Sequence, residues 1–211
     1  MDTSSAAAIR RPQVRFKYIL FVAFVLMFLF VLWDRERFII DHSHPLWRYY
    51  FPVRWWLLPH GLAALTALLI GPFQFSSRFR QRHLRVHRIM GCVYLGGIAV
   101  AATIGMYLAA VHSSVGIRFY VFAVAPAWLL TAGIAFVCVR NGNIPLHRQF
   151  MVRSYAITST FVTDRIFDAI LAIYRPGAVV FGAVTWSVLV ATLVLTELGL
   201  AWQGIFINKR A

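Results

Sequence analysis

The chain has 211 residues, of which 60% are apolar and only 13% are charged, and its formal net charge is +14. Soluble domains are about half apolar and about a quarter charged, so this composition argues against a soluble enzyme, a disordered chain and a disulfide scaffold. The two cysteines, Cys92 and Cys138, lie in apolar stretches and form neither a zinc motif nor a disulfide framework. The composition therefore predicts a protein that crosses a membrane several times.

Six stretches are apolar enough to cross a bilayer, for which a helix needs about 20 predominantly apolar residues. In chain order these predicted spans are 16–33, 55–76, 89–111, 117–139, 149–174 and 178–202. We therefore predict an all-α transmembrane bundle of six spans, whose remaining parts are a basic N-terminus (1–15), an outer segment (34–54) before the helical bundle (55–202), and a C-terminal tail (203–211). The first span ends without a small-residue cleavage site, so we interpret it as a signal anchor.

The basic residues are distributed unequally between the two sides of these spans. With the N-terminus inside, 14 of the 21 Lys and Arg residues fall on the cytoplasmic side and 6 on the outer side. This asymmetry follows the positive-inside rule and predicts a multi-pass membrane protein with both termini in the cytoplasm. Because the positive charge is spread over the inner helix ends, its expected partners are anionic membrane lipids, and nucleic acid is excluded.

Two histidines begin helices that run in the same direction. His87 opens the third span and His147 opens the fifth, and each is followed by an arginine, Arg88 or Arg148. Gly91, one turn beyond His87, would let a flat ring approach that face. Two imidazoles from facing helices are the axial ligands of a b-type haem, and arginines can pair with its anionic propionates. The pattern predicts one haem b near the cytoplasmic side; the alternative is that the His-Arg pairs anchor the chain to lipid phosphates.

A second polar group lies toward the outer side of the predicted bundle. Asp164, Arg165 and Asp168 lie within the fifth span, and His60 lies in the first turns of the second span. Charged groups inside a membrane are costly unless they are paired or line a cavity. We expect these four residues to form an outer polar site, and the alternative is an ion pair that fastens the fifth helix to the second.

Three further features carry less specific expectations. His112 closes the third span and is a candidate to meet His60 in an alternative haem site. The segment 41–44 contains two histidines and an aspartate, which suits either a divalent metal or an ordinary polar loop. Glu197, in the sixth span, is expected to pair with Arg153 or with another arginine.

Several strings of the sequence resemble one family. They are His60-Gly61, the run Leu84–Tyr94 (LRVHRIMGCVY) and the run His147–Ala156 (HRQFMVRSYA), followed by Arg165. Over roughly residues 55–175, the chain resembles the bacterial membrane family called domain of unknown function 2306. This resemblance implies a topology and candidate positions, and it implies no chemistry.

A looser likeness is to the transmembrane dihaem cytochromes b, which exchange electrons with ascorbate or quinone and carry histidines on four successive helices. The fourth predicted helix of this chain contains no histidine. The likeness therefore implies at most one haem, bound by the third and fifth helices.

Three functions remain open at the level of sequence. The first is a haem-binding protein that passes electrons between a quinone and a redox protein partner. The second is a small transporter or channel-like protein whose path includes the outer polar site, with histidine protonation as its driver. The third is a structural or assembly subunit. The chain contains no phosphate-binding loop, nucleophile elbow or zinc-protease motif, so nothing indicates a hydrolase.

Overall fold

The computed structural model describes residues 22, 25, 26, 29, 30, 33, 41–174 and 178–206. The chain forms two compact units, Met1–Trp47 and Arg48–Ala211. The predicted basic N-terminus (1–15) and most of the predicted first span (16–33) lie outside the described residues. The fold below is therefore that of the second unit.

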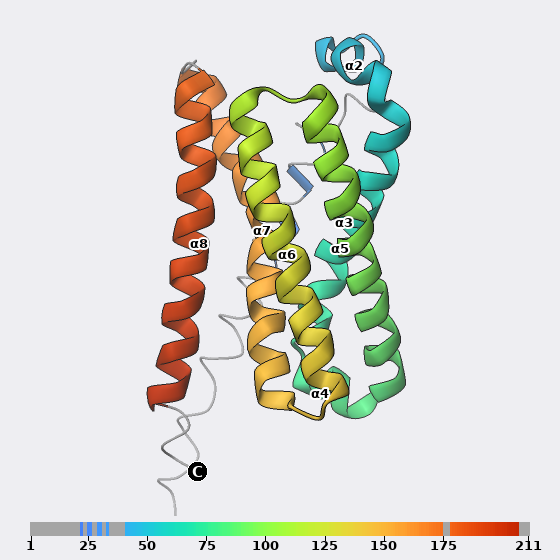
Figure 1. Cartoon of the computed structure of the whole chain (residues 1–211), viewed down its shortest axis with the longest axis vertical. Helices are drawn as coiled ribbons and strands as arrows, with labels where there is room; N and C mark the ends of the chain where they lie inside the picture. The colour runs from blue at the N-terminus through green and yellow to red at the C-terminus, as the bar shows by residue number, and fades with distance from the viewer. Residues whose placement is uncertain are drawn as a thin grey trace, which may run out of the picture. The chain divides into compact units, whose positions relative to one another are not determined.

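Within the described residues, all regular structure is helical (Figure 1). A short helix and a 3-10 turn come first, and five long helices follow with one further short helix between the first two of them. The elements are α2 (Pro45–Tyr50), η2 (Phe51–Val53), α3 (Arg54–Gln74), α4 (Ser77–Arg82), α5 (Leu84–His112), α6 (Val115–Arg140), α7 (Ile144–Tyr174) and α8 (Ala178–Phe206). The five long helices correspond in order to the second to sixth predicted spans.

Four helical segments of the described chain are long and apolar enough to cross a membrane. They are Leu46–Gln74, Leu84–His112, Val115–Arg140 and Gly182–Gln203. Helix α7 is also long enough, at 31 residues, but its charged side chains lower its hydropathy. The predicted all-α architecture is thus confirmed for the described residues, and four of the six predicted spans are long and apolar enough to cross a membrane.

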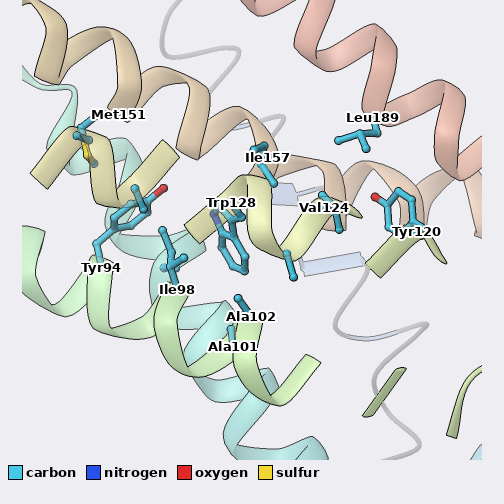
Figure 2. Close-up of a cluster of buried hydrophobic side chains, with 14 residues drawn as sticks. Tyr94, Ile98, Ala101, Ala102, Tyr120, Val124, Trp128, Met151, Ile157 and Leu189 are labelled. Atoms are coloured by element: carbon cyan, nitrogen blue, oxygen red, sulfur yellow. The ribbon is translucent and has the colours of Figure 1, made fainter. Parts of the chain in front are cut away.

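Helices α3, α5, α6 and α7 form a bundle whose successive members are antiparallel, because short turns join them (Figure 1). Helix α5 packs against α3 and α6, and α7 packs against α6 and α8. Figure 2 shows the core that these contacts bury, with Tyr94 and Ile98 from α5, Trp128 from α6 and Ile157 from α7 converging on the bundle interior. Helices α5 and α7 therefore run in the same direction on opposite sides of the core.

Small residues bring α3 and α5 close together. A Cβ atom added at Gly97 of α5 would lie 2.9 Å from the carbonyl oxygen of Ala63 in α3. One added at Gly105 would lie 3.1 Å from Cε1 of His60. In a membrane, helices associate largely through such close packing, so these glycines set the distance between the two helices.

An ion pair joins α7 to α8. Arg153 donates to both carboxylate oxygens of Glu197, from Nε to Oε1 at 2.5 Å and from an Nη atom to Oε2 at 2.8 Å. The guanidinium also lies over the ring of Phe150, 4.9 Å from its centroid. The predicted pairing of Glu197 with Arg153 is confirmed, and its bidentate geometry fixes the register of α8 on α7.

Replacing Glu197 with Gln is expected to weaken the attachment of α8 by about 0.5–1 kcal/mol, because the ion pair is lost but is partly exposed, and the amide oxygen of Gln still accepts one hydrogen bond from Arg153. Detergent-induced unfolding of the purified protein measures this effect. The swapped double variant Arg153→Glu/Glu197→Arg should recover part of the loss. Equal unfolding midpoints for the wild type and Glu197→Gln would show that the pair contributes nothing to stability.

Candidate functional site

A hydrogen bond across the core sets the relative heights of α5 and α7. The hydroxyl of Tyr94 lies 3.0 Å from Oγ of Ser154, and both side chains are completely buried. His87 lies seven residues before Tyr94, and His147 lies seven residues before Ser154. Seven residues make two helical turns, about 10 Å, so each histidine lies on the same helix face as its bonded neighbour. The two histidines are therefore level with each other, on faces that look across the bundle end.

The turn before α7 positions His147 as the fourth residue of its helix. Gly142 adopts a positive φ of 76°, and the side chain of Asn143 accepts a hydrogen bond from the backbone N–H of Leu146. The Nδ1 atom of His147 then donates to the carbonyl oxygen of Ala135 in α6 at 2.8 Å. A proton on Nδ1 of the neutral ring leaves the lone pair on Nε2, the arrangement that a metal-binding histidine requires.

His87 is likewise the fourth residue of its helix, α5. Its ring is close enough to His147 for the two to interact electrostatically, and the charges of Arg80 and Arg88 also reach it. Its Nδ1 atom is buried and has no hydrogen-bond partner among the described residues. Arg88 itself is exposed, as is Arg148.

Gln74, the last residue of α3, lies over Gly91: a Cβ atom added at Gly91 would be 3.7 Å from its Oε1. The face of α5 that was expected to admit a flat ring at this position is thus covered by an amide. Sequence reasoning missed Gln74, because a single polar residue at a helix end gives no periodic signal.

A buried hydroxyl network separates the histidine end from the rest of the core. Thr158 Oγ1 donates to the carbonyl oxygen of Ser154 and accepts from the indole N–H of Trp128 at 3.0 Å, and it also lies 3.1 Å from the Tyr94 hydroxyl. All four side chains are nearly or completely buried. The sequence signal is the spacing of Ser154 and Thr158, one turn apart on α7, which predicts a shared helix face but not its partners.

The residues of the predicted outer polar site make contacts with different helices. Asp164 accepts a hydrogen bond from the Tyr120 hydroxyl of α6 at 3.0 Å, and its Oδ1 atom is buried without a partner among the described residues. His60 is bonded through Nδ1 to the carbonyl oxygen of Ala101 in α5 at 2.8 Å. Arg165 is exposed, and the side chain of Asp168 lies outside the described part of the chain.

A family model for predicted membrane proteins, DUF2306, matches residues 57–200, which is more than half of the chain. The chain belongs to the DUF2306 family. The resemblance seen over residues 55–175 is confirmed, and the match extends it through most of α8. No curated protein and no solved structure matches this DUF2306 protein. Nothing in these comparisons shows the likeness to b-type cytochromes.

Two further histidines of this DUF2306 protein, His60 and His112, lie toward the other end of α5. The His112 ring lies 4.3 Å from that of Tyr49, centroid to centroid. The His60 ring bonds to Ala101 and lies beside Gly105, which is seven residues, or about 10 Å along α5, from His112. The alternative haem site between His60 and His112 stays a prediction.

The polar segment at 41–44 behaves as a turn. His42 stacks on Trp47 with their centroids 4.2 Å apart, and Ser43 donates to the carboxylate of Asp41 through both its backbone N–H and its hydroxyl. No cluster of three metal-ligating side chains occurs among the described residues.

An open groove of about 460 Å³ lies along α7 and α8 of the DUF2306 protein, with Phe75 and Tyr155 at one side and Thr192 at the other. Neither His87 nor His147 lines it. The hydroxyl of Tyr155 is occupied, since it donates to the carbonyl oxygen of Leu68 at 3.2 Å. The groove is therefore separate from the two histidines.

Proposed function

We propose that this DUF2306 protein is a six-span protein of the bacterial inner membrane that binds one haem b between His87 and His147. Both termini would lie in the cytoplasm, at the same side of the membrane as this site. Its electron-transfer partners would be a quinone or a redox protein. The distribution of Lys and Arg between the two sides supports the orientation, because the basic residues before and at the start of α5 belong to the more positive side.

The observation that carries this proposal is the register of α5 and α7. Tyr94 bonds directly to Ser154. His87 lies two turns before Tyr94 and His147 two turns before Ser154, so the two histidines lie at the same level on facing sides of their helices. Cofactor sites in helical bundles are built from side chains on such facing helices. A bis-histidine haem needs this arrangement.

The chemistry of each ring also supports the proposal. The Ala135 carbonyl oxygen holds His147 with its Nε2 lone pair free of the proton. The exposed guanidinium groups of Arg88 and Arg148 follow the two histidines directly and would pair with anionic propionates at the membrane surface. Haem, when bound, would supply the one-electron chemistry, and the chain would orient it and keep its ring out of water.

An absorption spectrum of the purified protein, expressed with added haem precursor, tests the proposal. The wild type should show a reduced-minus-oxidised haem spectrum, and His87→Ala or His147→Ala should each abolish it while the helical content is retained. Each substitution removes one axial ligand, and a single remaining imidazole does not hold the iron in the same state.

His83→Ala is the matched control, because His83 is an exposed histidine at the same end of the bundle. This variant should keep the full spectrum. A wild-type protein that stays colourless after haem supplementation would overturn the proposal, and so would a spectrum that survives both single substitutions.

A further inference from the structure

The end of the bundle that holds His87 contains two buried polar atoms without partners. Gln74 is only 7% exposed, and its Nε2 atom has no hydrogen-bond partner among the described residues. The Nδ1 atom of His87 is also buried and has no hydrogen-bond partner among those residues. Leaving a buried donor unpaired costs about 1–3 kcal/mol. Two such atoms at one end of a well-packed bundle therefore indicate a partner beyond the part of the chain that the structure describes.

The two atoms belong to neighbouring side chains. The Gln74 amide lies over Gly91, and Gly91 is one turn from His87 on the same face of α5. The amide nitrogen can only donate hydrogen bonds. The missing partner must therefore offer an acceptor, and an oxygen atom is the commonest one.

The positive charge around His87 favours a bound anion. Arg80 and Arg88 both act electrostatically on His87. The sequence contains no acidic residue between Asp41 and Asp164. The helices α3, α4, α5 and α6 therefore contain no carboxylate side chain.

The acidic residue nearest in depth on the remaining helices is already engaged. Glu197 of α8 is held by both donor groups of Arg153. Among the described residues, no other acidic side chain lies at this end to balance the arginines, which favours a bound lipid or ligand as the source of negative charge.

We propose that Gln74 Nε2 and His87 Nδ1 donate hydrogen bonds to an oxyanion bound at this end of the bundle, with Arg80 supplying positive charge. The oxyanion is a carboxylate or a phosphate oxygen, and its two sources are a haem propionate and the headgroup of an anionic lipid. A lipid phosphate can accept from both donors, whereas a propionate can accept from Gln74 alone, because Nδ1 of an iron-bound His87 points away from the porphyrin. A proton on Nδ1 leaves Nε2 of His87 available to iron, so the inference is compatible with the proposed haem and does not depend on it.

The test replaces the amide by an apolar side chain of similar size. In Gln74→Leu, the donor is removed while the packing over Gly91 is largely kept. Gln81→Leu is the matched control, because Gln81 lies on α4 at the same end and is exposed. Gln74→Met, with a flexible side chain of similar length, serves as the second variant should the branched leucine disturb the fold.

Two arms of the experiment distinguish the sources of the oxyanion. In the first, the full-length protein is placed in nanodiscs of phosphatidylglycerol or phosphatidylcholine, and native mass spectrometry measures which lipid is retained. In the second, the protein is reconstituted with hemin or with hemin dimethyl ester, whose propionates carry no charge. The first arm detects a lipid phosphate, and the second detects a haem carboxylate.

The wild type and Gln81→Leu should prefer the anionic probe in at least one arm, and Gln74→Leu should lose about tenfold of that preference, which corresponds to about 1.4 kcal/mol. Unchanged preference in both arms for Gln74→Leu and Gln74→Met would overturn the inference, as would a wild type without preference. A colourless protein whose phosphatidylglycerol retention depends on Gln74 would refute the haem and leave the oxyanion site intact. A protein that binds haem, but whose preference for the anionic probe does not depend on Gln74 in either arm, would refute the oxyanion site and leave the proposed haem intact.

Discussion

Gly97→Val is expected to force α3 and α5 apart and to destabilise the protein by about 3 kcal/mol or more. A Cβ at this position would lie 2.9 Å from the Ala63 carbonyl oxygen, closer than real Cβ atoms come to such an atom. The carbonyl belongs to the backbone of α3, so no side-chain rotation relieves the clash, and whole helices must move. Overpacking of this kind commonly costs about 1–3 kcal/mol even where side chains can adjust.

Gly96→Val provides the control for that experiment. It makes the same chemical change one residue earlier on the same helix, where an added Cβ meets nothing within 4 Å. Any effect of valine on helix propensity is therefore shared by the two variants, and their difference isolates the contact with Ala63. Detergent-induced unfolding measures both, and equal midpoints would show that α3 and α5 do not approach each other as described.

Trp128→Ala is expected to cost about 3–5 kcal/mol, the range for removing a fully buried large aromatic side chain. Trp128 is 1% exposed, and its ring lies 5.1 Å from that of Phe161, centroid to centroid. Its truncation leaves a cavity at the centre of the bundle and removes the N–H that Thr158 accepts. The unfolding midpoint in detergent is the measurement.

Two controls separate volume from hydrogen bonding in that prediction. Trp128→Phe keeps most of the ring and should cost about 1 kcal/mol, the scale of a single hydrogen bond between membrane helices. Trp55→Ala removes a tryptophan that is 71% exposed and should have little effect on unfolding. A Trp128→Ala variant as stable as Trp55→Ala would contradict the described core.

The extent of α5 shows what hydropathy does and does not predict. The apolar pattern predicted a span at 89–111, whereas the helix covers Leu84–His112. Its first five residues include Arg85, His87 and Arg88, which end the apolar stretch but do not end the backbone hydrogen bonding. Apolar length reports the part of a helix that suits hydrocarbon, and the helix itself continues into the polar surface region.

Only one property of the candidate site could be predicted from the sequence, namely the depth of each residue along its helix. Counting put His87 and His147 at equal depth, and the bond between Tyr94 and Ser154 supplies the same register. The partner of Asp164 was not predictable, because spacing shows which residues share a face and not which helix covers it. Helix α7 packs mainly against α6 and α8, so Asp164 meets Tyr120 of α6.

The side chains of Tyr94, Trp128 and Thr158 form a closely packed layer across the middle of the bundle. Its polar atoms satisfy one another and its side chains are at most 2% exposed, so no continuous file of water runs through the interior in this conformation. Anything that reaches the space beside His87 must then enter from that end of the bundle or sideways from the surrounding lipid.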